Sequence, residues 1–171
     1  MCGIFGVHGH PDAAAVTHLG LYSLQHRGQE SAGIAAVDAQ GSAHAVRRMG
    51  LVGEGLKESE LRALRGGGIA IGHTRYSTAG SSSLENAQPV LARSRVGHIA
   101  LAHNGNLTNA LDLRDVLEAQ GAIFQSTMDS EVIVHRIARS TALTPEARVA
   151  EALYAVEGAY CLLIVIGDTL V

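Results

Sequence analysis

The chain begins Met1-Cys2-Gly3-Ile4-Phe5-Gly6, and this stretch predicts a short buried strand over Gly3–Val7. The side chain of Cys2 is small, so removal of Met1 during synthesis would leave a thiol and a free α-amine on one residue. An N-terminal amine titrates near pH ~8 and a free thiol near ~8.5, so the amine can accept the thiol proton close to neutrality. Cys2 therefore suits N-terminal nucleophilic catalysis, and a buried structural cysteine is the competing interpretation.

Length and composition indicate one soluble domain spanning residues 1–171. Hydrophobic residues make up 47% of the chain and aromatic residues only 4%, so small aliphatic side chains must form most of the core. The net charge of −3 offers no basic surface for nucleic acid or anionic lipid. The sequence shows no signal peptide and no apolar run of membrane-spanning length, so we expect a cytoplasmic protein without nucleic-acid or membrane partners.

The two cysteines, Cys2 and Cys161, form neither a disulfide framework nor a metal-binding pair. Cys161 lies in the apolar run 159–166, and we expect it in the core, where a free cysteine behaves as a small hydrophobic residue. The nine histidines show no ligand spacing, so we expect no metal and no cofactor in this chain.

Apolar periodicity and turn residues predict an alternation of paired strands and helices. The expected strands cover residues 3–7, 33–37, 43–49, 69–76, 90–93, 98–103 and 160–166. The expected helices begin at residues 12, 58, 108, 130 and 144, and end near residues 26, 64, 120, 139 and 158. Strands grouped in hairpins, with helices before and after them, predict an α+β fold in which helices cover antiparallel sheets.

The first helix carries the most specific expectations. Asp12 should cap its N-terminus, and Val16, Leu19 and Tyr22 should form its buried face. Gly28 should end it in a left-handed conformation.

The last residues predict a hairpin that is not completed. Gly167–Thr169 has the composition of a turn, and Leu170–Val171 would begin a returning strand. We therefore expect that the chain is truncated at its C-terminus, with an exposed sheet edge and a tendency to associate.

Four polar segments interrupt the apolar pattern, at residues 25–33, 73–78, 103–106 and 128–131. In the second of them, Arg75 ends an apolar strand and precedes a long polar loop. Its guanidinium could bind a carboxylate through two hydrogen bonds, or it could lie on the surface with its stem packed on the strand. A polar loop of this length inside a compact domain is usually functional or mobile.

The other candidate residues also have two interpretations each. Asn104-Gly105 after a strand is a strong turn signal, but the Asn104 amide and the Gly105 N–H could also point at a developing oxyanion. Asp129 could cap the helix that follows it, or its carboxylate could hold the ammonium group of a substrate.

Together these segments resemble the class II glutamine amidotransferases, whose glutaminase domain is an N-terminal-nucleophile hydrolase. The matching segments keep the family's order along nearly the whole chain and are Cys2–Gly6, His26–Gly28, His73–Arg75, His103–Leu107 and Asp129–Glu131.

Within that class, Gln25–Gly33, Arg75–Gly80 and Asn86–Pro89 are similar to the amidophosphoribosyltransferases. The glutaminase half of a glucosamine-6-phosphate synthase is an alternative, but that type has Trp where Tyr76 stands and His-Pro where Gln88-Pro89 stands. An inactive glutamine-binding module is a second alternative.

The resemblance implies a four-layer αββα sandwich with Cys2 at the start of a strand. It also implies that Cys2 attacks the side-chain amide of glutamine, with its own α-amine as the general base. Asn104 and Gly105 would stabilise the oxyanion, and water would then hydrolyse the γ-glutamyl thioester.

The resemblance assigns the substrate contacts as well. Arg75 would hold the α-carboxylate of glutamine and Asp129 its α-ammonium, while Arg27 would brace the surroundings of the nucleophile. The loop 77–89 would close over the site, and the further binding residues at its start would be Tyr76, Ser77 and Thr78.

The family enzyme continues into a phosphoribosyltransferase domain, and the sequence 1–171 has no acidic diphosphoribose-binding loop. We therefore expect the missing domain to use the ammonia to make 5-phosphoribosylamine in purine synthesis. Magnesium is expected only for that domain. The full-length enzyme is expected to be a homo-oligomer.

Overall fold

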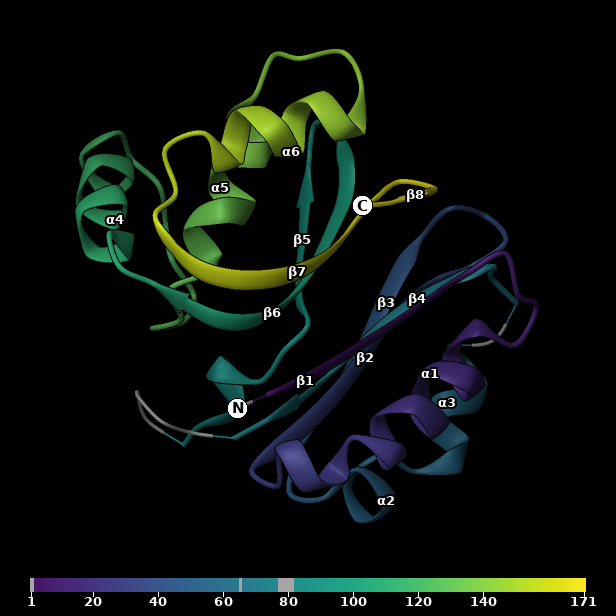
Figure 1. Ribbon diagram of the computed structural model, residues 1–171. Coiled ribbons are helices and arrows are strands. Elements are labelled where there is room, and N and C mark those ends of the chain that lie inside the picture. Colours follow the sequence, from purple (N-terminus) through teal and green to yellow (C-terminus); the bar gives the residue numbers. More distant parts are fainter. Residues whose placement is uncertain (1, 65, 77–81) are drawn as a thin grey trace.

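The computed structural model describes residues 2–64, 66–76 and 82–171. Their strands form two antiparallel sheets of four strands each, which pack face to face. Helices α1–α3 cover the outer face of one sheet, and α4–α6 cover the outer face of the other (Figure 1). The expected α+β class and the four-layer αββα arrangement are confirmed.

The first sheet has the strand order β1-β4-β2-β3. Its strands are β1 (Gly3–His8), β2 (Ser31–Val37), β3 (Ala43–Met49) and β4 (Ile69–Arg75). Gly3 pairs with Thr74 and Ser31 with Arg75, so the start of β1 and the start of β2 both lie beside the end of β4.

The second sheet is a meander in the order β5-β6-β7-β8. Its strands are β5 (Val90–Ser94), β6 (Gly97–Leu107), β7 (Gly158–Ile166) and β8 (Thr169–Leu170). The expected hairpin turn after residue 166 is confirmed, because Ile166 pairs with Thr169. β6 extends four residues beyond the expected strand end, which makes Asn104-Gly105 part of a strand and not a turn.

The helices follow the expected order, with one short addition. They are α1 (Ala13–Ser23), α2 (Val52–Gly55), α3 (Glu58–Ala63), α4 (Ala110–Ala119), α5 (Glu131–Arg139) and α6 (Pro145–Leu153), with 3-10 turns η1 (Gln25–Arg27) and η2 (Leu84–Asn86). α2 was not expected from the sequence. In the described ranges, no helix has the length and apolar character needed to cross a bilayer.

Three apolar clusters separate the four layers. The cluster between the sheets is rich in small side chains, including Ala35, Ala100 and Ala102. Small residues allow the two sheets to approach closely, and β1 accordingly contacts both β6 and β7. This contact brings the N-terminal end of the chain against the second sheet.

The buried face of α1 differs from the expected one. Leu19 is 65% exposed and Tyr22 is 62% exposed, whereas Thr17 and Leu21 are fully buried. Leu21 and small residues form this face, and α1 lies so close to β1 that a Cβ on Gly20 would be 2.5 Å from the Phe5 ring. Asp12 precedes the helix, but its side chain makes no capping hydrogen bond.

The expectation for Gly28 is also wrong. Its φ of −164° and ψ of 128° are extended, so it does not end a helix in the left-handed region. A side chain is excluded there for another reason, since a Cβ would lie 2.6 Å from the carbonyl of Thr74. The Thr74 hydroxyl donates to the Gly28 carbonyl at 2.6 Å, which ties this loop to β4.

Candidate functional site

A cavity of about 660 Å³ lies where the start of β1 meets β6 and β7. The described residues that line it are Cys2, Tyr76, Asn104, Gly105, Gly158, Ala159, Tyr160 and Cys161. Cys2 and Tyr76 belong to the first-sheet side, and Asn104 and Gly105 to the second sheet. The cavity therefore joins residues that are more than a hundred positions apart in the sequence.

Cys2 is partly exposed and held by contacts on both of its ends. Its Sγ lies 3.9 Å from the carbonyl oxygen of Tyr76, to which it donates. Its own carbonyl oxygen accepts a hydrogen bond of 3.1 Å from Nε of Arg27. Arg27 therefore contacts the residue that it was expected to brace, and the bracing role stays a prediction.

Asn104 and Gly105 face the same cavity from β6. Gly105 has a φ of +152°, which disfavours other residues, and a Cβ there would lie 2.2 Å from the Ala159 carbonyl oxygen. Glycine at 105 thus lets β6 and β7 pass closely beside the cavity. The Asn104 side chain takes part in none of the hydrogen bonds between described residues, so its amide is available to a ligand.

The backbone of His103 holds this pair in place. Its N–H donates to Oε1 of Gln88 at 2.7 Å, and its carbonyl oxygen accepts from Nε2 of His73 at 3.1 Å. His73 is completely buried in β4, and this desolvation lowers its pKa to about 3, although the hydrogen bond to His103 opposes the change. His73 is therefore neutral in the folded protein, with its proton on Nε2.

Asp129 contacts the same stretch of β6, at His103 and Leu107. Its Oδ2 accepts from the Leu107 N–H at 2.9 Å, its Oδ1 accepts from the Ser130 N–H at 2.8 Å, and Nδ1 of His103 lies 3.5 Å from Oδ1. Burial raises the pKa of this carboxyl, but His103 and the two N–H groups outweigh burial and lower the pKa overall. Asp129 is ionised at neutral pH, and it is not among the described residues that line the cavity.

Arg75 is only 8% exposed, so the surface interpretation of this residue is wrong. Its Nη1 donates to Oε1 of Glu30 at 2.9 Å, and its carbonyl oxygen accepts from the Glu30 N–H at 3.0 Å. This ion pair fixes the guanidinium of Arg75 against Glu30, and Arg75 is also absent from the described lining of the cavity.

Tyr76 is 54% exposed at the mouth of the site. Ser77 and Thr78, which the sequence also assigned to substrate binding, lie outside the described residues, as does most of the first half of the loop 77–89. The described second half contains Asn86 and Gln88, both buried, and the latter reaches the backbone of His103.

Two residues near the site were not predicted from the sequence, and the expected position of a third is wrong. Glu30 and Gln88 lie in quoted segments, but no pattern in the sequence links Glu30 to Arg75 or Gln88 to His103. Cys161 was expected in the core and is exposed in the cavity, directly across the strand pair from Asn104. It lies on the face of β7 that carries Leu163 and Val165, just beyond the end of the apolar layer between the sheets.

Within the described residues, no group of three or more His, Cys, Asp or Glu side chains is placed to hold a metal ion. The chemistry that the cavity offers is that of a thiol facing hydrogen-bond donors. A thiol at the start of a strand can attack a carbonyl carbon, and an amide and an N–H opposite it can stabilise the oxyanion that results.

The fold and the site together define a class of protein. Residues 73–169 match the family described as "Glutamine amidotransferase domain", and the chain belongs to that family. Its fold is that of the N-terminal-nucleophile hydrolases.

The curated relatives that it resembles are amidophosphoribosyltransferases. The enzyme of Rhizobium etli is 51% identical over 95% of this chain, that of Bacillus subtilis is 49% identical over 95%, and a chloroplastic enzyme of Arabidopsis thaliana is 45% identical over 99%. The chain covers 32%, 34% and 32% of these proteins, so it spans about a third of their length.

Two solved structures are similar as well. One is the glutamine phosphoribosylpyrophosphate amidotransferase of B. subtilis complexed with ADP and GMP, with a TM-score of 0.87 and 45% identity over 98% of this chain and 35% of that one. The other is described as the allosteric regulatory enzyme of purine biosynthesis, with a TM-score of 0.89 and 46% identity over 99% of this chain and 36% of that one.

Proposed function

We propose that this domain hydrolyses glutamine to glutamate and ammonia through a thioester on Cys2. The observation that carries the proposal is the shared cavity, in which the thiol of Cys2 and the Asn104-Gly105 pair face one space from two different sheets. Membership of the glutamine amidotransferase domain family supports the same substrate.

In the proposed reaction, removal of Met1 frees the α-amine of Cys2, which takes the proton from the thiol. The thiolate attacks the side-chain carbonyl carbon of glutamine, and the oxyanion is stabilised by the Asn104 amide and the Gly105 N–H. The amine returns the proton to the leaving nitrogen, and ammonia departs. Water then attacks the thioester, which releases glutamate and restores the thiol.

The remaining site residues are proposed to hold the amino-acid end of glutamine. Arg75 would bind the α-carboxylate, with Glu30 keeping its guanidinium oriented, and Asp129 would bind the α-ammonium. Both side chains lie outside the described lining of the cavity, and Tyr76, Ser77 and Thr78 are proposed as further contacts to the substrate. No metal or cofactor takes part in the steps proposed for this chain.

We further propose that the domain supplies ammonia to a phosphoribosyltransferase domain, which makes 5-phosphoribosylamine for purine synthesis in the cytoplasm. The names of the relatives and the share of their length that is matched support this assignment. Magnesium would be needed only by that domain, and the full-length enzyme would be a homo-oligomer. A sugar-amidating synthase is not favoured, because the relatives described above are amidophosphoribosyltransferases.

The test is a glutaminase assay on protein from which Met1 has been removed, with glutamate as the measured product. Cys2→Ala, and a variant with an uncleavable extension before Cys2, should each reduce glutamate release to background. Equal release from all three proteins would contradict the mechanism. Glutamine binding without any glutamate release would instead favour the inactive glutamine-binding module.

A further inference from the structure

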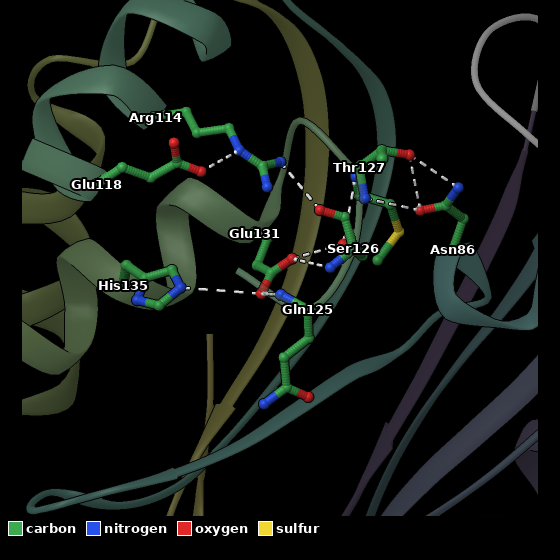
Figure 2. A network of polar contacts seen from close by, with 9 residues as sticks. Asn86, Arg114, Glu118, Gln125, Ser126, Thr127, Glu131 and His135 are labelled. Atoms are coloured by element: carbon green, nitrogen blue, oxygen red, sulfur yellow. Dashed lines mark hydrogen bonds and ion pairs between the residues drawn. The ribbon is translucent and has the colours of Figure 1, made fainter. Parts of the chain in front are cut away.

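A buried carboxylate outside the proposed reaction organises the segment that leads to Asp129. The Glu131 side chain, in the first turn of α5, is only 7% exposed. Its Oε1 accepts from the Gln125 N–H at 2.9 Å, and its Oε2 accepts from both the N–H and the hydroxyl of Ser126, at 2.9 and 2.5 Å. Figure 2 shows this carboxylate pointing back into the turn of chain that precedes its own helix.

The same turn is fixed from two further sides. Nη1 of Arg114 in α4 donates to the Ser126 carbonyl oxygen at 2.9 Å, and the Ser126 hydroxyl accepts from the Met128 N–H at 3.2 Å. Gln125, Ser126 and Met128 therefore each take part in this network. Asp129 follows it directly, so these contacts help to set the position of its carboxylate, beside the contacts that the carboxylate makes to Leu107, Ser130 and His103.

The network also reaches the described half of the loop beside the cavity. Asn86 is buried, and its Oδ1 accepts from the Thr127 N–H at 3.1 Å, while its Nδ2 donates to the Thr127 hydroxyl at 3.0 Å (Figure 2). Two residues later, Gln88 accepts from the N–H of His103, the neighbour of Asn104. Hydrogen bonds and the short stretches of backbone between them thus connect Glu131 with the segment before Asp129 and with the residue before Asn104.

We propose that Glu131 is a positioning residue for substrate binding, which holds the 125–128 turn so that Asp129 meets the α-ammonium of glutamine. This inference rests on the function proposed above. Glu131 itself touches neither the cavity nor Cys2, and it acts through Ser126 and Asp129.

The stoichiometry of the contacts explains why a carboxylate is required. Three hydrogen-bond donors converge on two oxygens, both oxygens must accept, and Nε2 of His135 lies 3.8 Å from Oε1. Glutamine at 131 would offer one oxygen and one NH2 group, so at least one N–H of the turn would face a donor and the turn would shift. Asp129 would move with it, while the cysteine and the oxyanion donors on β1 and β6 would keep their own backbone support.

The experiment measures glutamine hydrolysis by protein lacking Met1, with Glu131→Gln compared to the unsubstituted protein. We expect KM for glutamine to rise about tenfold and kcat to stay within about threefold, because the lost contact serves the bound substrate and not the reacting carbon. Glu146→Gln is the matched control. It removes a carboxylate from the first turn of α6, where Glu146 is exposed, and it should change neither constant.

A second readout separates positioning from general damage. Iodoacetamide has no α-ammonium group, so the rate at which it alkylates the Cys2-containing peptide should be the same, within twofold, in Glu131→Gln and in the unsubstituted protein. If alkylation and kcat fall together with the rise in KM, or if KM does not change, the inference is wrong.

If Glu131→Gln does not fold, Ser126→Ala tests the positioning role of Glu131 instead. It removes the hydroxyl that joins Glu131 to the Met128 N–H but leaves both N–H contacts of the carboxylate, so KM should rise about threefold at unchanged alkylation. An unchanged KM in this variant overturns the inference. Absence of glutaminase activity in the unsubstituted protein would overturn the proposed function instead, so the two failures are distinguishable.

Discussion

Gly105 shows how a single backbone position can determine both packing and chemistry. Alanine there would combine a disfavoured φ with a Cβ placed 2.2 Å from the Ala159 carbonyl oxygen. We expect Gly105→Ala to lower the free energy of unfolding by about 3 kcal/mol or more. Gly97→Ala is the control, because Gly97 has a φ of +95° but no described atom lies within 4 Å of the added Cβ. It should cost only about 1 kcal/mol in urea unfolding. Equal costs would mean that β7 does not crowd this position.

The role of Asn104 is tested at the same scale. Asn104→Ala removes one oxyanion donor, so we expect kcat for glutamine to fall by about 10²–10³-fold with little change in KM. Asn106→Ala, two residues along β6 and exposed, should have a much smaller effect on kcat. A rise in KM without a loss of kcat would show that Asn104 binds the ground state and does not stabilise the oxyanion.

Single residues were predictable from the sequence where a short motif carried the chemistry. Cys2, Asn104 and Gly105 could be proposed from local order alone, and they lie in one cavity. Gly28 could not be interpreted correctly, because its requirement comes from Thr74, which is distant in sequence. Glu131 was quoted only as part of a motif, since its partners become visible once the preceding turn is folded back onto α5.

At the scale of elements, His73 is a titratable link between the two sheets. The pKa of His73 in the folded protein is about 3, below the ordinary value of 6.5. Between these two pH values, His73 is protonated in the unfolded chain but neutral in the folded protein. Its contribution to stability is therefore complete above about pH 6.5 and is lost as the pH falls toward 3, with a slope of up to about 1.4 kcal/mol per pH unit. We expect urea unfolding to show a loss of stability between about pH 7 and pH 5.

Replacing His73 shows how much of the pH dependence of stability this residue causes. His73→Gln keeps a side-chain N–H for the His103 carbonyl but does not titrate, so the difference in stability between the two pH values should become smaller. His8→Gln, at the exposed end of β1, should leave that difference unchanged. An equal pH dependence in all three proteins would contradict the assignment of His73 as the buried neutral group. Asp129 and Glu131 do not interfere, because their pKa values are lowered and they titrate below this range.

Elements with strong local patterns were predicted well. The two hairpins, α3 and α5 begin and end close to the expected residues. α6 begins where it was expected, after Thr144, whose hydroxyl accepts from the Ala147 N–H at 3.2 Å, but it ends at Leu153 and not near residue 158. The face of α1 was wrong because Gly20 and the alanines pack against β1, and small residues give a weak periodic signal. The end of β6 was wrong because pairing with β7 outweighs the local turn preference of Asn-Gly.

For the whole molecule, the layer of small residues between the sheets determines how closely the two halves of the site approach. Ala102 is completely buried in that layer, two residues before Asn104. We expect Ala102→Leu to lower stability by about 2 kcal/mol and to lower kcat more than tenfold, because it pushes β6 away from the sheet that carries Cys2. Both are measured by urea unfolding and by glutaminase assay on folded protein.

Leu101→Ala provides the comparison on the other face of the same strand. Leu101 packs toward the helices α4–α6, and its truncation should cost about 3 kcal/mol while leaving the distance between the sheets unchanged. The more destabilised variant should thus be the more active one. If activity instead follows stability in both variants, the spacing of the sheets does not govern the site.

Cys161 has a practical consequence for anyone who studies this cavity with thiol reagents. It is exposed and lines the same space as the proposed nucleophile, opposite Asn104. An alkylating or oxidising compound therefore finds two sulfur atoms within one enclosure, and inactivation alone does not reveal which of them reacted. Studies with covalent inhibitors or activity-based probes therefore need the Cys161→Ser variant, or localisation of the adduct by mass spectrometry. Either one shows whether a compound has reacted with Cys2.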